Sequence, residues 1–218
     1  MKLKNIKAVI FDLDGTLIDS MGLWKNIDLE FLSKRNLFCP DNLQEQINGL
    51  SMYETAEFFK KKYQLSDSCE MLMKEWTDMA YMAYRNEIPL KPGAYEFIKN
   101  LKTNHILTGI ATSNAQTLVT ASLLHHQLQD DINEIVTANE VDHGKPFPDV
   151  FLECARRLQV LPKDCLVFED LLEGIEAAHS AGMQVISIYD DYTREITDEK
   201  IKQSDDYILN YYDDILKF

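Results

Sequence analysis

Long apolar runs are absent from this sequence, and their absence limits where the chain can reside. The N-terminal segment has one short apolar run, residues 8–11, and two aspartates follow it almost at once. Such a run is too short for the core of a signal peptide or for a membrane-spanning helix. We therefore expect a cytoplasmic protein without a membrane partner.

Cysteine is scarce, and its spacing follows no known pattern. The chain has four cysteines with no C-x-x-C pair and no spacing typical of a metal site; they are Cys39, Cys69, Cys154 and Cys165. Neither a disulfide framework nor a zinc-type site is indicated. We expect free thiols in a reducing compartment.

Basic residues are also few. Lysine and arginine number 22 against 36 aspartates and glutamates, which gives a net charge of −14. A surface this acidic repels the phosphates of nucleic acids and of anionic membranes, so we expect neither as a partner. A small anionic substrate would need a local positive charge or a metal ion.

Six short apolar runs alternate with helical patterns along the chain. The runs cover residues 7–12, 106–112, 133–138, 165–170, 184–190 and 206–210. Runs that are apolar on both faces suit a parallel sheet covered by helices on both sides. The clearest helices begin at Asn114 as N-cap, begin near Pro148, and end before Gly182. The alternation predicts an α/β fold, a doubly wound parallel sheet with a Rossmann-like core.

The segment 20–88 breaks this alternation. It shows helical apolar stripes and no convincing strand. Ser51 and Glu54 have the spacing of a capping box, which marks the start of a helix. We expect an all-helical domain over 20–88, inserted into a core built from 1–19 and 89–218.

Two aspartates stand at the end of the first apolar run. Strand side chains alternate, so Asp12 and Asp14 face the same way, and ligands of open α/β sheets bind beyond the carboxyl ends of the strands. Two neighbouring carboxylates need a cation or must divide one proton between them. Gly15 lets the backbone turn sharply and approach a ligand. The stretch fits a functional site, although an Asp-Gly turn or a calcium-type loop has the same form.

Two further stretches carry groups suited to an anion. Thr112, Ser113 and Asn114 follow the second apolar run at the start of a helix, where hydroxyl and amide groups favour phosphate. Simple N-capping is the alternative. Lys145 lies in the stiff sequence G-K-P, which suits a fixed point charge for phosphate. The alternative is a solvated surface lysine.

Glu169 and Asp170 end the fourth apolar run. Adjacent carboxylates at a strand end suit Mg²⁺, which takes one or two carboxylates together with water and phosphate oxygens. The alternative is an acidic N-cap for the helix that follows.

These four stretches occur in order, and they resemble the four motifs of the haloacid dehalogenase-like phosphatase superfamily. They read FDLDGTLIDS (11–20), ATSN (111–114), GKPFPDVF (144–151) and VFEDLLEGIEAAHSAGM (167–183). The overall form is similar to the β-phosphoglucomutase-like branch, in which a helical cap domain follows the first motif. The resemblance implies a Mg²⁺-dependent phosphomonoester hydrolase. It would act on a small phosphorylated metabolite, such as a sugar phosphate, through an aspartyl-phosphate intermediate.

The resemblance also assigns roles. Asp12 would be the nucleophile, and Asp14 would protonate the leaving oxygen and then activate water. Because an alkoxide leaves with a proton and a halide does not, Asp14 favours phosphoryl transfer over dehalogenation. The metal would be held by Asp12, by Asp14 through its carbonyl, and by Asp170, with Glu169 in the inner or outer shell. The phosphate-binding set would be Asp12, Leu13, Asp14, Gly15, Thr112, Ser113, Asn114 and Lys145, of which Thr112 and Lys145 are also counted as catalytic.

The inserted helices depart from the mutases of this branch. Those enzymes carry a histidine and an arginine where this chain has Trp24 and Met52, and a mutase must grip a bisphosphate with such charges. A plain phosphatase is therefore favoured; a sugar-phosphate mutase is the alternative, followed by a non-catalytic binding protein on the same fold. Trp24 either lines the substrate pocket or belongs to the cap core, and Ser51 either contacts substrate or only caps its helix. We expect a monomer, with a dimer as the alternative.

Overall fold

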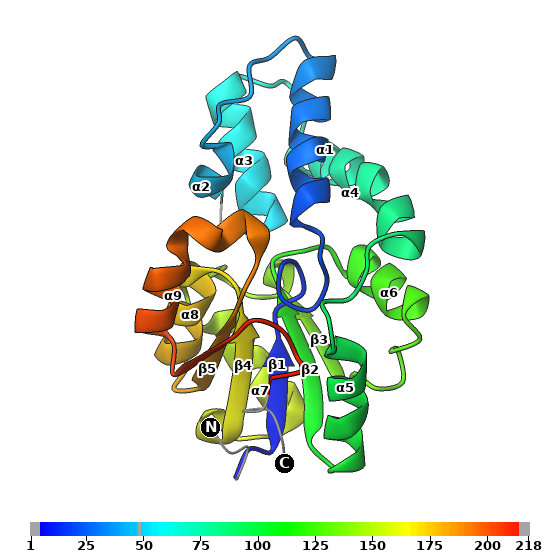
Figure 1. The fold of residues 1–218 in the computed structure, drawn as a ribbon. Helices are drawn as coiled ribbons and strands as arrows, with labels where there is room; N and C mark the ends of the chain where they lie inside the picture. Colours follow the sequence, from blue (N-terminus) through cyan, green and yellow to red (C-terminus); the bar gives the residue numbers. More distant parts are fainter. Residues whose placement is uncertain (1–4, 48, 214–218) are drawn as a thin grey trace.

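The centre of the protein is a parallel β-sheet (Figure 1). The strands are β1 (Ala8–Phe11), β2 (Leu107–Thr112), β3 (Glu134–Thr137), β4 (Cys165–Glu169), β5 (Gln184–Ile188) and β6 (Asp206–Ile208). Over residues 5–47 and 49–213, which the computed structural model describes, six strands pair in the order β3-β2-β1-β4-β5-β6. Each neighbouring pair is parallel. The predicted doubly wound sheet is confirmed, with β1 between β2 and β4.

Helices cover both faces of the sheet. They are α5 (Ala94–Thr103), α6 (Gln116–His125), α7 (Asp149–Leu158), α8 (Leu172–Ser180) and α9 (Thr197–Gln203), with 3₁₀ turns η1 (Ala138–Glu140), η2 (Pro162–Asp164) and η3 (Asp191–Ile196). Side chains of β1 alternate between two apolar clusters. Val9 and Phe11 pack with α5 and α6, whereas Ala8 and Ile10 pack with α7 and α8. Burial on both faces explains why the strands read as continuous apolar runs.

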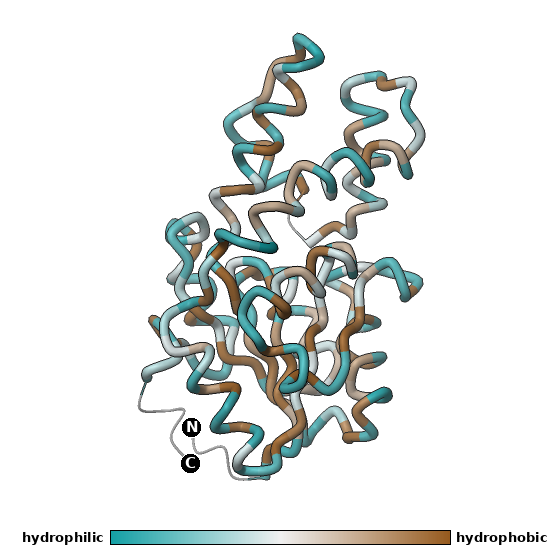
Figure 2. The backbone as a smooth tube through the Cα atoms, turned by 90° about the vertical axis from the view of Figure 1, so that its right-hand side faces the viewer, coloured by the Kyte–Doolittle hydropathy of each residue, from teal (hydrophilic) through white to brown (hydrophobic). Residues whose placement is uncertain are grey.

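Further helices lie between β1 and α5 and stand over the carboxyl ends of the strands (Figure 1). They are α1 (Met21–Lys34), α2 (Leu43–Ile47), α3 (Met52–Tyr63) and α4 (Cys69–Asn86), and are called the cap helices below. Figure 2 shows them from the side as a layer beyond the sheet. Their own aromatic core joins Phe31, Phe59 and Trp76, with ring centroids 5.0 to 5.8 Å apart. The capping box predicted at Ser51 and Glu54 is present at the start of α3.

Two chain segments connect the cap helices to the core, and they run side by side. The N–H of Asp19 donates to the carbonyl of Pro89 at 3.0 Å, and the N–H of Lys91 donates to the carbonyl of Leu17 at 2.9 Å. Helix α4 also packs along α6, which gives the cap helices a second contact with the core. The cap helices are therefore held over the edge of the sheet where β1 and β2 end.

Helix ends were predicted with mixed success. Gly182 has φ +74° directly after the C-cap of α8, which confirms the predicted stop. Helix α6 starts later than predicted, because Ala115 and not Asn114 is its N-cap. The side-chain oxygen of Asn114 accepts the N–H of Ala115 at 2.7 Å, while its amide group is turned to the cavity described below.

All four cysteines are free thiols, as expected. None of the helices in the described part of the chain is both long and apolar enough to span a membrane.

Candidate active site

The carboxyl ends of three adjacent strands bring the predicted motifs together. Asp12 follows β1, Thr112 ends β2 and Asp170 follows β4. A cavity of about 150 Å³ lies at this edge, between the core and the cap helices. Its lining includes Asp12, Asp14, Thr112, Ser113, Asn114 and Lys145 from the core, and Trp24 and Met52 from the cap helices. Residues far apart in sequence therefore face one small space.

Lys145 joins two buried carboxylates. Its Nζ atom lies 2.6 Å from Asp12 Oδ1 and 2.7 Å from Glu169 Oε2, and the residue is 5% exposed. Burial lowers the pKa of Lys145, but the charges of Asp12 and Glu169 outweigh burial and raise that pKa above its ordinary value. Burial raises the pKa of Asp12 to about 8, against the opposing charge of Lys145. The ammonium group is thus a fixed positive charge beside Asp12.

Three carboxylates form a cluster that could hold a metal ion. Oxygens of Asp12, Glu169 and Asp170 lie within 4.8 Å of one another, and all three residues are buried. Asp170 Oδ1 accepts a hydrogen bond from Thr16 Oγ1 at 2.8 Å, whereas its buried Oδ2 atom has no partner among the described residues. Burial, together with the charges of Glu169 and Asp12, raises the pKa of Asp170 well above its ordinary value. An unpaired buried carboxylate oxygen is costly and a cation would satisfy it, so the donors fit a metal ion.

Two glycines keep this cluster compact. Gly15 has φ +77°, and a Cβ atom there would lie 2.4 Å from Asp170 Oδ2. A Cβ atom at Gly174 in α8 would lie 2.1 Å from Glu169 Oε2. The other oxygen of Glu169, Oε1, accepts the N–H groups of Asp170 and Leu171, each at 3.1 Å. Both oxygens of Glu169 are therefore engaged by the protein, which suits an outer rather than an inner ligand.

Asp14 occupies a different environment in the same cavity. Its Oδ1 atom accepts hydrogen bonds from Ser20 Oγ at 2.5 Å, from Trp24 Nε1 at 3.2 Å and from the Tyr84 hydroxyl. Its Oδ2 atom accepts one from Asn114 Nδ2 at 2.8 Å. Asp12 is thus held by a cation and Asp14 by neutral donors, two of which belong to the cap helices. One carboxylate beside a lysine and a second on neutral donors suit a nucleophile and a proton carrier.

Comparison with known proteins identifies the family. Residues 9–188 match the model of the haloacid dehalogenase-like hydrolases. The chain belongs to the haloacid dehalogenase-like hydrolase family.

Individual relatives of this haloacid dehalogenase-like chain include phosphatases and mutases. A protein named "Probable pseudouridine-5′-phosphatase" from Drosophila melanogaster is 34% identical over 194 residues, which cover 86% of this chain and 84% of that protein. The β-phosphoglucomutase of Bacillus subtilis is 29% identical over 219 residues, which cover 94% of this chain and 92% of that one. The crystal structure of CbbY from Rhodobacter sphaeroides in complex with phosphate has a TM-score of 0.84 at 24% identity, over 94% of this chain and 95% of that chain. The last likeness supports the fold.

Of the predicted phosphate-binding residues, Leu13 and Gly15 are not among those that line the cavity of this family member, and Thr112 and Ser113 line it with their hydroxyl groups engaged by the protein. Thr112 is buried, and its Oγ1 atom accepts the N–H of Asn114 at 3.1 Å. Ser113 donates to the carbonyl of Gly49 at 3.3 Å, which links the core to the segment before α3. The N–H of Gly15 donates to the carbonyl of Ile18 at 2.9 Å. The Leu13 side chain belongs to the apolar core, so any contribution of Leu13 and Gly15 through their backbone stays a prediction.

Trp24 belongs to the apolar packing of the cap helices and also reaches the cavity, and its contact with a substrate stays a prediction. Its side chain packs against the apolar core of the cap helices, lines the cavity and donates to Asp14. Met52 lines the cavity as well, whereas the Ser51 hydroxyl accepts the N–H of Glu54 at 3.1 Å as the cap of α3. Leu171, which directly follows Glu169 and Asp170, also lines the cavity.

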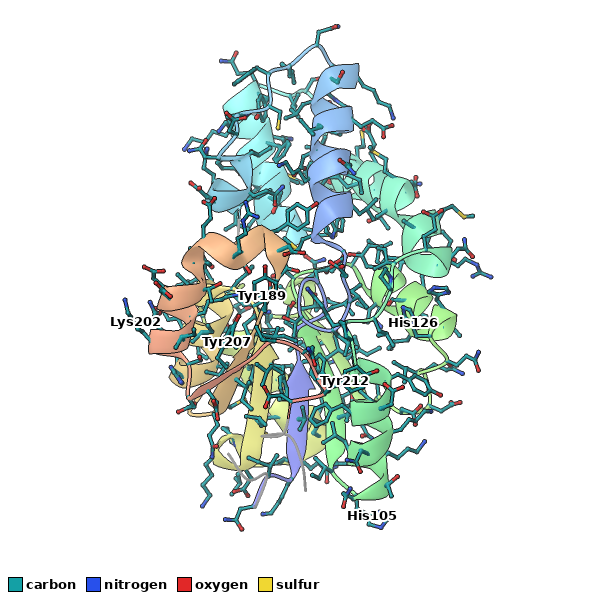
Figure 3. The ribbon with its side chains drawn as sticks, viewed as in Figure 1. His105, His126, Tyr189, Lys202, Tyr207 and Tyr212 are labelled. Atoms are coloured by element: carbon teal, nitrogen blue, oxygen red, sulfur yellow. The ribbon has the colours of Figure 1, made fainter. Side chains whose placement is uncertain are left out.

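Sequence reasoning missed several residues of the site. Ser20 and Tyr84 donate to Asp14, and Thr16 donates to Asp170. Asp28, Gln44 and Trp76 line the cavity from the cap helices. Tyr84 had one signal: it lies four residues after Ala80 on the buried stripe of α4, where a hydroxyl needs a partner. The five histidines show no spacing typical of a metal site. Figure 3 places His105 at the end of the core opposite the cap helices, and no histidine is among the described residues that line the cavity.

Proposed function

We propose that the protein is a Mg²⁺-dependent phosphomonoester hydrolase that acts on a small phosphorylated metabolite through an aspartyl-phosphate intermediate. The observation that carries the proposal is the arrangement of Asp12 and Asp14 in one cavity. Asp12 lies against Lys145 and the acidic cluster, and Asp14 lies on neutral donors. The phosphatase name of the relative from Drosophila melanogaster supports the same reaction class.

The reaction follows from these positions in two halves. A carboxylate oxygen of Asp12 attacks phosphorus, and the bond between phosphorus and the leaving oxygen breaks. Asp14 gives its proton to that oxygen, so the alcohol leaves neutral. Asp14, now ionised, then takes a proton from water, whose oxygen attacks phosphorus and releases Asp12. Lys145 stays beside Asp12 in both halves and stabilises the charge on the phosphoryl oxygens.

Mg²⁺ is the metal that we propose for the acidic cluster. Asp12, Asp170 and the carbonyl of Asp14 would hold it, with Glu169 as an outer ligand that also holds Lys145. An all-oxygen donor set of this kind suits Mg²⁺. When bound, the ion would supply positive charge to the phosphoryl oxygens of an anionic substrate.

The helices over 20–88 act in this proposal as a cap domain that covers the reacting groups. Trp24 and Met52 occupy the positions where mutases of the β-phosphoglucomutase-like branch carry a histidine and an arginine. Lys145 is the one cation among the described residues that line the cavity, and Asp12 already holds it. A mutase needs a second phosphate site, so hydrolysis is favoured, and the likeness to β-phosphoglucomutase keeps isomerisation as the alternative.

Cytoplasmic location and a monomeric state complete the proposal. The free thiols of all four cysteines support a reducing compartment. Sedimentation of the purified protein decides between a monomer and a dimer.

Phosphate release tests the function. The purified protein is incubated with Mg²⁺ and a panel of phosphorylated sugars, polyols and nucleosides, including β-glucose 1-phosphate with its bisphosphate. We expect free phosphate from at least one class of compound, no release in EDTA, and recovery when Mg²⁺ is restored. Isomerised sugar phosphate without free phosphate would instead establish a mutase.

Asp12→Asn tests the nucleophile in the same assay. We expect its turnover to fall about 1,000-fold or more, with an unchanged circular dichroism spectrum. Asp19→Asn, an exposed aspartate of the same stretch, should keep wild-type turnover. Full activity of Asp12→Asn would remove Asp12 from the mechanism.

A further inference from the structure

We propose that Asp28, Gln44 and Trp76 form a recognition wall for an uncharged leaving group that offers a hydrogen-bond donor. The inference rests on the proposed phosphatase function and names its substrate class. The three residues come from α1, α2 and α4 and line the same cavity as Asp12 and Asp14. They are called the distal wall below.

Asp28 is an unusual residue for this position. It is 7% exposed, it sits on a helix face with Ile27, Phe31 and Leu32 as the other buried residues, and it faces the cavity. Its Oδ2 atom accepts one hydrogen bond, from Gln44 Nε2 at 2.5 Å. No other described residue donates to it, so Oδ1 is left as a free acceptor. Burial raises the pKa of Asp28 to about 7, against the hydrogen bond from Gln44.

Trp76 contributes an aromatic ring to the distal wall. The residue is 3% exposed, and its Nε1–H is buried without a hydrogen-bond partner in the part of the chain that the structure describes, so this donor is not open to a ligand in the cavity. The polar groups that a ligand can reach on this wall are those of Asp28 and Gln44. The rest of the cap side of the cavity is largely apolar and includes Met21, Ile47, Leu50 and Met52. A few polar groups in an apolar pocket are the usual means of orienting a small ligand.

The charge of the cavity restricts what this ligand can be. Among its described lining residues Lys145 is the one cation, and Asp12 and Glu169 hold it. A second phosphate or a carboxylate on the leaving group would therefore meet Asp28 with no cation beside it. A hydroxyl or a ring N–H can instead donate to Asp28. The shared chemistry is a neutral donor, and its sources are the hydroxyls of a polyol or sugar and the N–H of a nucleoside base.

Matched substrates test this assignment in the full-length protein with Mg²⁺. The polyol pair is sorbitol 6-phosphate against n-hexyl phosphate, which has the same carbon chain without the further hydroxyls. The nucleoside pair is pseudouridine 5′-phosphate against its N1-methyl derivative, which lacks one ring donor. The charge pair is glucose 6-phosphate against glucose 1,6-bisphosphate. The quantity compared is the ratio of kcat/KM within each pair, because a ratio does not depend on how much of a variant is folded.

We expect wild type to prefer the donor-bearing member of the polyol or the nucleoside pair by about 10-fold to 100-fold, since a site built for a donor leaves its acceptor unpaired with the analogue. It should also disfavour the bisphosphate. Asp28→Asn should reduce both preferences about 10-fold. Gln44→Ala, which removes the hydrogen bond to Asp28 without touching its charge, should weaken the donor preference and retain the rejection of the bisphosphate. Asp78→Asn, an exposed carboxylate on α4, should keep the wild-type ratios.

The outcomes separate this inference from the proposed function. Phosphate release with ratios that Asp28→Asn and Gln44→Ala leave unchanged would overturn the distal wall and leave the phosphatase intact. No phosphate from any compound would overturn the phosphatase, and the inference with it. A preference within the polyol pair alone identifies the donor as a hydroxyl, and a preference within the nucleoside pair alone identifies it as a ring N–H.

Discussion

Asp14 shows how single residues set the chemistry of this site. Four side chains donate to its two oxygens, and two of them, Trp24 and Tyr84, belong to the cap helices. The Tyr84 hydroxyl also accepts hydrogen bonds from Trp24 Nε1 at 2.8 Å and from Asn114 Nδ2 at 2.9 Å. Burial and the charge of Asp14 raise the pKa of Tyr84 well above its ordinary value, so the phenol stays a donor. Tyr84 therefore positions Asp14, the carboxylate that we propose as the proton carrier.

Tyr84→Phe removes this hydroxyl and keeps the ring. We expect kcat to fall about 10-fold for an alkyl phosphate, because a misplaced Asp14 protonates the leaving oxygen less well. The loss should be smaller for p-nitrophenyl phosphate, whose phenolate leaves without a proton, and KM should change little. Steady-state kinetics on both substrates measure the split, with Tyr53→Phe, an exposed cap tyrosine, as the matched control. Equal losses on the two substrates would contradict a role through Asp14.

Asp28 makes the stability of the protein depend on pH. Burial raises its pKa from 3.8 to about 7, so the folded protein binds this proton more tightly than the unfolded chain. The cost of burying Asp28 is therefore absent below the unfolded pKa, grows as pH rises and is complete above pH about 7. Asp28→Asn should gain stability relative to wild type by about 2 kcal/mol more near pH 8 than near pH 5.5, at about 1.4 kcal/mol for each pKa unit. Urea unfolding at both pH values measures the difference, and a gain independent of pH would show that the pKa is not raised.

Helix α8 supports the site through Gly174, whose lack of a side chain leaves room for Glu169. Glu169 lies against Gly174, and it holds Lys145 with one oxygen and the start of α8 with the other. Gly174→Ala would gain up to about 1 kcal/mol from helix propensity. The new Cβ atom, 2.1 Å from Glu169 Oε2, would cost about 1 to 3 kcal/mol through overpacking. The clash outweighs the propensity gain.

We therefore expect Gly174→Ala to lower both the free energy of unfolding and the turnover, since a displaced Glu169 releases Lys145. Glu176→Ala, on the exposed side of the same helix, should leave both within error. Urea unfolding and phosphate release measure the two effects. A stabilised and fully active Gly174→Ala would mean that Glu169 can move without consequence.

The strands of the sheet could be predicted because each is buried on both faces. The positions of the polar groups at the strand ends follow from the strands. Parallel strands end at one edge, so Asp12, Thr112 and Asp170 had to meet once the strands were recognised. The sequence could not reveal which residues of the cap helices meet them. Tyr84 and Asp28 sit on helix faces that read as ordinary apolar stripes, and only the packing of those helices turns them to the cavity. The sequence predicts Asn114 as an N-cap, because an asparagine at a helix start commonly has that role. Only the structure shows that its amide donates to Asp14.

At the scale of the whole molecule, acidic charge dominates the cavity, and Lys145 is the one cation among its described lining residues. The chain carries a net charge of −14, and five carboxylates lie in or beside the cavity: Asp12, Asp14, Asp28, Glu169 and Asp170. Long-range attraction of an anion is therefore weak, and in the proposed function substrate binding would depend on Lys145 and on the proposed metal ion at close range. The proposed preference for uncharged leaving groups would follow from this charge distribution, because each further negative charge on the substrate adds repulsion.

A buried ion pair connects the segment that returns from the cap helices to the residues that follow β5. Lys91, in the segment that returns from the cap helices, lies with its Nζ atom 2.5 Å from Asp190 Oδ2, and the Asp190 side chain is fully buried. Lys91→Met keeps the aliphatic stem but leaves the carboxylate of Asp190 without this partner, which should reduce the free energy of unfolding by about 3 kcal/mol. Lys74→Met removes a cation from an exposed i,i+4 pair with Asp78 and should cost less than about 0.5 kcal/mol. Urea unfolding of both variants at one pH makes the comparison. Equal stability of the two variants would mean that the buried pair adds no more to stability than the exposed one, and that the backbone hydrogen bonds and the packing of α4 on α6 hold the cap helices to the core.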